Sequence, residues 1–220
     1  MTLEARERSL TYPAMLVWAL FTSLLVNSIA AAEEPSTRVE TPMEQSAIAT
    51  FAGGCFWCLQ PPFDALKGVR STTVGYTGGT TLNPTYEEVC SGATGHAEAI
   101  QIVYDPSKVS YEQLLERFWH NINPTTLNQQ FADHGTQYRT AIFYHTAEQQ
   151  RLAEASKAQW ERSGKFTEPI VTDIVPASTF YPAEAYHQKY YQKNAIHYKL
   201  YRIGSGRDGY LRRVWGEESH

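Results

Sequence analysis

The sequence predicts an α+β protein in which helices cover a β-sheet. Two observations carry this prediction: short apolar or β-branched runs alternate with helical patterns along most of the chain, and several helices begin with recognisable capping signals. The 220 residues are enough for one ordinary domain with extensions. With 42% hydrophobic residues and a formal charge of -4, the composition is that of a soluble globular protein and lacks the basic surface of a nucleic-acid binder.

The N-terminal residues 1–32 are predicted to be a signal peptide. Arg6 and Arg8 precede an uncharged, largely apolar stretch, and Ala30-Ala31-Ala32 is a small-residue site of the kind cut after secretory signals. About twenty predominantly apolar residues can also span a bilayer, so an uncleaved membrane anchor over residues 10–32 is the alternative. Either interpretation places the domain outside the cytoplasm, in the periplasm or secreted. The polar residues 33–46 are predicted to be a linker.

The first half of the predicted domain, residues 47–200, contains three strands and two helices. The apolar run 47–51 is a strand, a glycine pair turns the chain, and a helix follows. The next elements are a strand over 69–76, a short helix over 83–89 and a strand over 97–104. Alternation along that last strand places Glu98 on the same face as Ile100 and Ile102.

The second half begins with a capping box, Ser110 with Gln113, which opens a helix with an apolar stripe. Thr146 caps a longer helix that ends before Gly164. Strands are expected over 138–144 and 170–175, and a helix over 183–194. The tyrosine-rich tail, residues 201–220, has no clear pattern. The alternation of elements does not say whether the strands run parallel or in mixed directions.

Two thiols two residues apart, in Gly53-Gly54-Cys55-Phe56-Trp57-Cys58, are the most informative feature. The glycine pair between strand and helix places both cysteines in the first helical turn. Unpaired backbone N–H groups and the helix dipole favour a thiolate there, and the thiolate is the reactive form of cysteine. Cys55 is therefore the candidate nucleophile.

Two plainer interpretations of this pair exist. Free cysteine often serves as a small buried hydrophobe, and Cys-x-x-Cys can be half of a zinc site. Zinc needs four ligands, whereas the chain has one further cysteine, Cys90, and no second close pair, so no metal is expected. The aromatic residues Phe56 and Trp57 between the thiols favour a reactive site with an apolar wall.

Four motifs in this order resemble the A-type peptide methionine sulfoxide reductase family over residues 47–193. They are Gly54-Cys55-Phe56-Trp57, Gly95-His96-Ala97-Glu98, Gly135-Thr136-Gln137-Tyr138-Arg139 and Tyr186-His187-Gln188. The resemblance implies a ferredoxin-like two-layer α/β sandwich with a mixed sheet and a long irregular C-terminal tail. It also implies a protein-repair enzyme that reduces methionine S-sulfoxide, free or in oxidised proteins, and that is mostly monomeric.

The family's site residues can be placed on this chain. Cys55 resembles the nucleophile that attacks the sulfoxide sulfur and becomes a sulfenic acid, and Glu98 matches the carboxylic acid that protonates the oxygen. Further positions match the substrate pocket: Phe56 and Trp57 as its apolar wall, Tyr86 and Tyr138 as hydroxyls that hold the oxygen, and Asp133 as a polar residue. His96 and His187 are taken as structural or orienting residues.

The physical chemistry of Glu98 agrees with that role. A sulfoxide oxygen leaves badly as an oxide, so a proton donor is needed. An exposed glutamate, with a reference pKa of about 4.3, is almost wholly ionised at neutral pH. Burial beside Phe56 and Trp57 would raise its pKa and keep the proton available, whereas a solvated surface position would not.

The sulfenic acid must then be resolved. The tail carries no cysteine, so Cys58 is the first candidate and Cys90 the second, although a buried packing role suits Cys90 better. Helical residues three apart have Cβ atoms about 5–6 Å apart, whereas a disulfide needs roughly 3.5–4.5 Å. Closing Cys55–Cys58 should therefore distort the first turn, which Pro61 and Pro62 make easier to loosen.

The family's electron donor is a thioredoxin-like protein, and no cofactor is expected. Because surroundings outside the cytoplasm oxidise thiols, a dedicated reductant is implied. Two other functions stay open at this point. A thiol-disulfide oxidoreductase would use the Cys55/Cys58 pair directly but leaves Glu98, Tyr86 and Tyr138 without a role. A binding module for methionine-bearing peptides would need no thiol chemistry.

Overall fold

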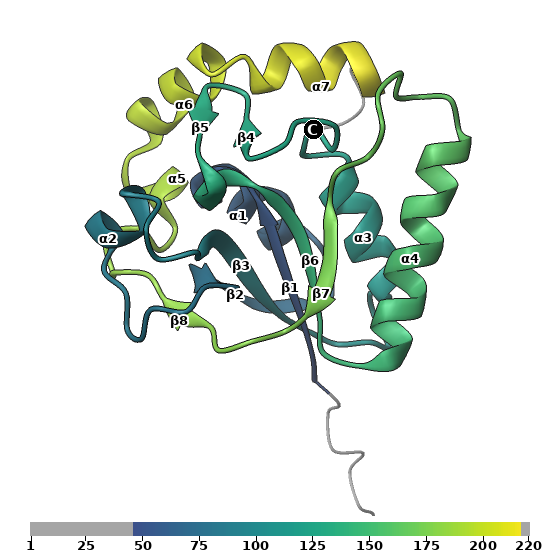
Figure 1. Cartoon of the computed structure of the whole chain (residues 1–220), viewed down its shortest axis with the longest axis horizontal. Helices are drawn as coiled ribbons and strands as arrows, with labels where there is room; N and C mark the ends of the chain where they lie inside the picture. Colours follow the sequence, from purple (N-terminus) through teal and green to yellow (C-terminus); the bar gives the residue numbers. More distant parts are fainter. Residues whose placement is uncertain (1–45, 217–220) are drawn as a thin grey trace, which may run out of the picture. The chain divides into compact units, whose positions relative to one another are not determined.

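A six-stranded mixed sheet forms the centre of the computed structural model, which describes residues 46–216 (Figure 1). Its strand order is β7-β6-β1-β3-β2-β8, with β6 and β7 parallel and the other neighbours antiparallel. The strands are β1 (Ala47–Gly53), β2 (Val69–Thr77), β3 (Ala97–Tyr104), β6 (Thr140–Tyr144), β7 (Asp173–Pro176) and β8 (Tyr181–Pro182). The predicted α+β class with a mixed sheet is confirmed.

The helices lie around this sheet, and a small hairpin lies above its end. They are α1 (Phe56–Asp64), α2 (Tyr86–Cys90), α3 (Tyr111–Trp119), α4 (Ala147–Arg162), α5 (Tyr190–Lys193), α6 (Ala195–Gly204) and α7 (Arg207–Trp215). The hairpin pairs β4 (Gln129–Gln130) with β5 (Asp133–His134), and a 3-10 turn, η1 (Thr136–Tyr138), follows it. All described residues belong to one compact unit.

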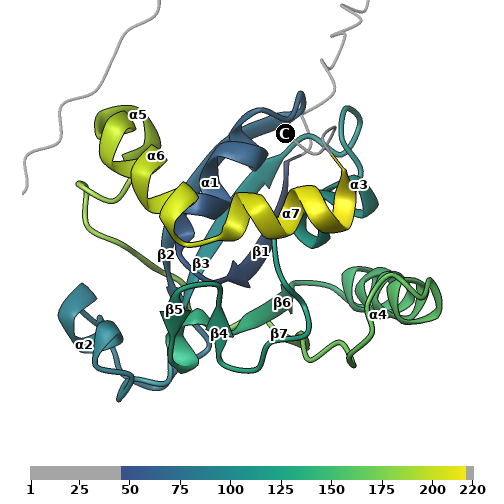
Figure 2. The same cartoon turned by 90° about the horizontal axis from the view of Figure 1, so that it is seen from above.

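The main core lies between the sheet and the helices α1 and α3, which share one face of it (Figure 2). Phe51 of β1 stacks on Phe63 of α1 and on Phe118 of α3, with ring centroids 5.6 and 5.0 Å apart. Alternation along β3 sends Ile100 and Ile102 into this core and smaller alanines to the opposite face, as predicted. Glu98 belongs to the core-facing set and is therefore buried.

The predicted caps form. The Ser110 side chain accepts from the backbone N–H of Gln113, whose side chain accepts from the Ser110 N–H, and Thr146 caps α4 in the same position. Gly164, with φ +67°, follows the end of α4. The strand expected over 138–144 begins only at Thr140, because the residues before it form the turn η1.

Two expectations for the C-terminal region are wrong. Of the helix expected over 183–194 only α5 forms, because Gln188 bonds through its side chain to the backbone N–H and C=O of Val74 in β2, and Lys189 is left-handed at φ 55°. Within its described residues, the tail expected to be irregular is mostly helical and forms the end of α6 and all of α7. The buried side chains of Arg207 and Leu211 hold α7 against the domain. Neither α6 nor α7 has a side-chain cap, so no capping signal in the sequence predicts them.

The predicted signal peptide and nearly all of the predicted linker lie outside the described residues. Within residues 46–216, no helix is long and apolar enough to span a membrane.

Candidate active site

Cys55 lies where β1 turns into α1, at the N-cap of that helix. The turn requires glycine at position 54, where φ is +77° and an added Cβ would lie 2.4 Å from the Cβ of Gln130. Gly53 is equally enclosed, since a Cβ there would lie 2.6 Å from a methyl group of Ile122. The glycine pair thus lets the chain pass close to its neighbours and brings Cys55 to the head of a buried helix.

Cys55 and Cys58 form a hydrogen-bonded pair of free thiols. Both are buried, with Cys55 7% exposed, and the backbone N–H of Cys58 donates to the carbonyl oxygen of Cys55 at 3.0 Å. Their side chains also hydrogen-bond to each other, and this bond lowers the pKa of Cys58 to about 7 against the opposing effect of burial. Arg207 and Arg202 lower it further.

The pKa of Cys55 is raised well above its ordinary value, first by burial and then by its bond to Cys58. The pair therefore loses one proton readily and the second with difficulty, as two interacting sites do. The charge rests on Cys58 with Cys55 as the donor. The sequence predicted that the helix N-terminus favours a thiolate in this turn, with Cys55 as the nucleophile; in the structure, burial is the largest effect on the pKa of Cys55 and raises it.

Glu98 is buried beside this pair, as the sequence predicted. Glu98 is only 2% exposed, and one of its carboxyl oxygens accepts a hydrogen bond from the backbone N–H of Phe56 at 3.0 Å. Burial raises the pKa of Glu98 to about 8, against the lowering effect of that bond and with a smaller raising effect from Asp133. At neutral pH the carboxyl is mostly protonated and can donate its proton.

A cavity of about 70 Å³ brings the sequence-predicted residues together. Its walls are formed by Cys55, Phe56, Trp57, Tyr86, Glu98, Asp133 and Tyr138, together with Tyr201. Burial raises the pKa of both Tyr86 and Tyr138, so their hydroxyls stay protonated and can donate to a polar oxygen. Of the predicted set, only Cys58 does not line the cavity.

The aromatic wall is held from outside the cavity. Trp57 stacks on Tyr190 with ring centroids 3.8 Å apart, and its indole N–H donates to Nδ1 of His187 at 2.9 Å. His187 also packs against Phe56, with centroids 5.0 Å apart. His187 therefore orients both aromatic residues, which fits the orienting role expected for it.

The other two residues weighed from the sequence are outside the cavity wall. His96 accepts from the backbone N–H of Gly79 and bonds the carbonyl oxygen of Thr81, which ties two loops together. Cys90 is partly exposed, and its thiol shares hydrogen bonds with the hydroxyls of Tyr86 and Tyr138. It thus contacts two hydroxyls of the cavity wall and not Cys55.

Sequence reasoning missed two side chains that the C-terminal helices supply. Tyr201 of α6 lines the cavity and donates a hydrogen bond to the carboxylate of Asp133. Arg207 of α7 contacts the glycine turn before Cys55. Both lie in the segment expected to be irregular, and no helical pattern marked them. Within the described residues, no group of three or more histidine, cysteine and acidic side chains could hold a metal ion.

Comparisons with known proteins identify relatives of this chain. The family model for peptide methionine sulfoxide reductase matches residues 47–219. The chain is 58% identical over 172 residues to the peptide methionine sulfoxide reductase MsrA of Bacillus velezensis, covering 78% of this chain and 97% of that relative. It is 57% identical over 173 residues to the Bacillus subtilis protein of the same name, covering 79% and 98%.

Two solved structures share the fold. Reduced Mxr1 from Saccharomyces cerevisiae superposes with a TM-score of 0.65 at 33% identity, covering 69% of this chain and 87% of that one. Methionine sulfoxide reductase A of Corynebacterium diphtheriae gives a TM-score of 0.62 at 34% identity, covering 69% and 76%. The family match spans nearly the whole described unit and includes every residue of the cavity wall, so this chain belongs to the A-type peptide methionine sulfoxide reductase family.

Proposed function

We propose that the protein reduces the S epimer of methionine sulfoxide to methionine, with Cys55 as nucleophile and Glu98 as general acid. The observation that carries this proposal is that both side chains face one cavity of about 70 Å³, where burial raises the pKa of Glu98 to about 8. A carboxylic acid that keeps its proton at neutral pH beside a sulfur nucleophile suits a substrate whose oxygen must be protonated before it can leave.

The first step needs the negative charge on Cys55. Because the two thiols are hydrogen-bonded, moving one proton from Cys55 to Cys58 transfers the charge between the sulfurs. The Cys55 thiolate attacks the sulfoxide sulfur, and the oxygen takes the proton of Glu98 and passes to Cys55. Methionine leaves and Cys55 becomes a sulfenic acid. The hydroxyls of Tyr86 and Tyr138 hold the oxygen, and Phe56 and Trp57 form the apolar wall around the methyl group.

The second step is resolution by Cys58. Its sulfur attacks the sulfur of Cys55, an S–S bond forms, the S–O bond breaks and the oxygen leaves as water after protonation. The hydrogen bond between the two thiols supports Cys58, whereas the thiol of Cys90 bonds to Tyr86 and Tyr138. Pro61 and Pro62, both inside α1, leave two helical hydrogen bonds unmade and lower the cost of the distortion.

The disulfide is then returned to the dithiol by an external reductant. We propose a thioredoxin-like protein, because a Cys55–Cys58 disulfide would be opened by thiolate attack and exchange with another dithiol. No bound cofactor takes part in this cycle. The substrate is methionine sulfoxide in oxidised proteins or as the free amino acid, so the protein would serve repair under oxidative stress.

The proposed place of action is the periplasm or the medium. The apolar N-terminal stretch, which ends in Ala30-Ala31-Ala32, supports export of the domain. Cell fractionation followed by N-terminal sequencing tests it: a mature chain that begins near residue 33 outside the cytoplasm is expected. A full-length chain in the membrane fraction would mean that the N-terminal stretch is a membrane anchor and not a cleaved signal peptide. A full-length chain in the cytoplasm would contradict export.

Turnover of the two sulfur epimers, supplied separately with dithiothreitol as reductant, tests the proposed activity. Reduction of the S epimer alone is expected. An insulin disulfide, supplied in parallel, serves as the control for disulfide exchange. If neither epimer is reduced while insulin is, the protein is a thiol-disulfide oxidoreductase despite its family. The Cys55→Ser variant should lose all turnover and keep its fold.

A further inference from the structure

Arg207 is a buried cation without a carboxylate partner among the described residues. It is the first residue of α7 and only 1% exposed. Its guanidinium donates to the backbone carbonyl oxygens of Asn121 and Gly53 and lies over the ring of Phe131, 4.5 Å from the centroid. Within residues 46–216, no acidic side chain lies at ion-pair distance from it. Burying a charge in this way is costly unless an opposite charge lies near.

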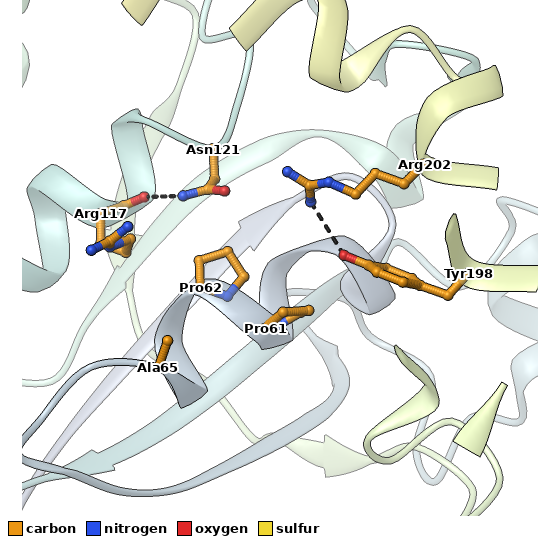
Figure 3. A pocket seen from close by; sticks show the side chains of 7 residues that line it. All are labelled: Pro61, Pro62, Ala65, Arg117, Asn121, Tyr198 and Arg202. Carbon is orange, nitrogen blue, oxygen red and sulfur yellow. Dashed lines mark hydrogen bonds between the residues drawn. The ribbon is translucent and has the colours of Figure 1, made fainter. Parts of the chain in front are cut away.

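The neighbouring Arg202 differs in this respect. Its Nε donates to Asp208 at 2.6 Å, so its charge already has a partner. Figure 3 shows its guanidinium beside Tyr198, at a pocket of about 290 Å³ that borders Pro61 and Pro62 of α1. One of its nitrogens also approaches the carbonyl oxygen of Cys58 at 3.4 Å. Of the two arginines near the thiol pair, Arg207 has the uncompensated charge.

The position of Arg207 points to the thiol pair as the missing anion. The carbonyl oxygen of Gly53 that it binds belongs to the turn that leads directly into Cys55. A Cβ on Gly54 would lie 3.2 Å from the Nη2 atom of Arg207, so the guanidinium lies against this turn. The turn and the cation are both buried, where charges act on each other more strongly than in bulk solvent.

The charged and titratable groups that interact electrostatically with Cys58 come from several elements. The cations are Arg207 of α7 and Arg202 of α6, and the anionic or ionisable groups are Glu98 of β3, Asp133 of β5, Cys55, Tyr198 and Tyr201. The tyrosines are neutral at physiological pH, Glu98 is mostly protonated, and Asp133 accepts a hydrogen bond from Tyr201. Because Arg202 is paired with Asp208, Arg207 is the cation near Cys58 that lacks an ion-pair partner among the described residues, and it acts on Asp133 as well.

We propose that Arg207 is the counter-ion of the Cys58 thiolate and thereby a positioning residue for the resolving step. The inference rests on the proposed function, in which Cys58 attacks the sulfenic acid of Cys55. In that step Cys58, which gained a proton when Cys55 was ionised, releases it to solvent, and its thiolate supplies the electron pair of the new S–S bond. Hydroxide leaves the Cys55 sulfur and takes a solvent proton to form water. The guanidinium keeps Cys58 in the ionised form that this attack requires.

The test compares Arg207→Gln and Arg207→Lys with the parent chain. Arg212→Gln serves as a matched control, because Arg212 is an exposed arginine on the same helix. The first readout is the pH dependence of Cys58 alkylation by iodoacetamide in a Cys55→Ser/Cys90→Ser background. We expect the Arg207→Gln variant to be alkylated about tenfold more slowly at neutral pH, the effect of one pKa unit. The Arg207→Lys variant, which keeps the charge, should recover most of the rate, and the Arg212 control should match the parent.

The second readout is a single turnover of the reduced enzyme with methionine S-sulfoxide. The parent and all variants should release one methionine per chain, whereas disulfide formation should be slower, by a similar factor, only in Arg207→Gln. Unchanged alkylation and disulfide formation in a folded Arg207→Gln variant would overturn the proposal. Absence of methionine release from the parent would instead overturn the proposed function.

The Arg207→Gln substitution removes buried hydrogen bonds that the guanidinium makes to the carbonyl oxygens of Asn121 and Gly53, and this loss can prevent folding. If Arg207→Gln does not fold, replacement of Arg207 by citrulline, its neutral isostere, keeps the shape and most of the hydrogen bonds while removing the charge. Slower alkylation of Cys58 in the citrulline variant supports the proposal, and a rate equal to that of the parent overturns it.

Discussion

The backbone N–H of Phe56 donates a hydrogen bond to the side-chain carboxyl of Glu98 at 3.0 Å. This bond joins the first turn of α1 to strand β3, and so fixes Glu98, the proposed general acid, relative to the residue that follows the proposed nucleophile. A bond from an N–H group favours the ionised carboxylate, yet the pKa of Glu98 is raised to about 8 because burial has the larger effect. The site thus holds its acid close to Cys55 without losing the proton.

The first prediction is a bell-shaped dependence of kcat/KM on pH. The rising limb should lie near pH about 7, where the pair loses its first proton, and the falling limb near pH about 8, where Glu98 is ionised. Measuring kcat/KM reports on the free enzyme, to which these pKa values belong. A rate that stays level well above pH about 8 would exclude Glu98 as the acid.

The second prediction concerns the Glu98→Gln variant, which should lose turnover by about 10²–10⁴-fold, the usual contribution of a general acid. The glutamine oxygen can still accept from the Phe56 N–H, so the local structure should persist. The initial rate with dithiothreitol at neutral pH measures the loss. Binding of a substrate-sized sulfoxide should change little, so a loss seen only in KM would contradict the assignment.

The same substitution should stabilise the fold at alkaline pH. The folded-state pKa of Glu98, about 8, lies above the ordinary glutamate value of 4.5. The unfolded chain therefore releases this proton first, and stability decreases as pH rises from about 4.5 to about 8 and then stays level with respect to this group. Glutamine has no such penalty. Thermal unfolding should show a gain for Glu98→Gln over the parent that grows through this window, and a gain independent of pH would contradict the raised pKa.

The sequence predicts the first half of the domain and the residues of the cavity wall well, and for a physical reason. Glu98 lies on a strand whose period-two alternation places it with Ile100 and Ile102, so its burial follows from the pattern. Ser110 and Thr146 announce their helices by local hydrogen bonds that the chain makes with itself.

The C-terminal helices are different, because their positions depend on contacts with distant parts of the chain. Arg207 binds carbonyl groups at Asn121 and Gly53, and Tyr201 bonds to Asp133. From the sequence alone, an arginine in a segment without an apolar stripe is expected at the surface, so the burial of Arg207 could not be predicted. The roles of these side chains can be found only when the contacts are known.

The third prediction concerns Gly54→Ala, with Gly164→Ala as the matched control. Both glycines have positive φ, +77° and +67°, so both substitutions carry the backbone cost of a left-handed conformation. Only at Gly54 would the added methyl group meet Gln130, at 2.4 Å; nothing lies within 4 Å at Gly164. Urea unfolding should therefore show the Gly54 variant to be less stable than the control by about 1–3 kcal/mol, the usual cost of overpacking. Equal losses would mean that the turn can move to accept the side chain.

The fourth prediction separates the two thiols. A Cys58→Ser chain should release one methionine in a single turnover, because Cys55 and Glu98 remain, but no Cys55–Cys58 disulfide can follow. Dithiothreitol is small enough to reduce the sulfenic acid directly, so slow turnover should continue with it and stop with thioredoxin, which acts on disulfides. Cys90→Ser is the matched control, and it should keep turnover with both reductants because its thiol bonds to Tyr86 and Tyr138 and not to Cys55. The reverse pattern, with thioredoxin-dependent turnover lost in Cys90→Ser and kept in Cys58→Ser, would make Cys90 the resolving thiol and would require α2 to move toward Cys55.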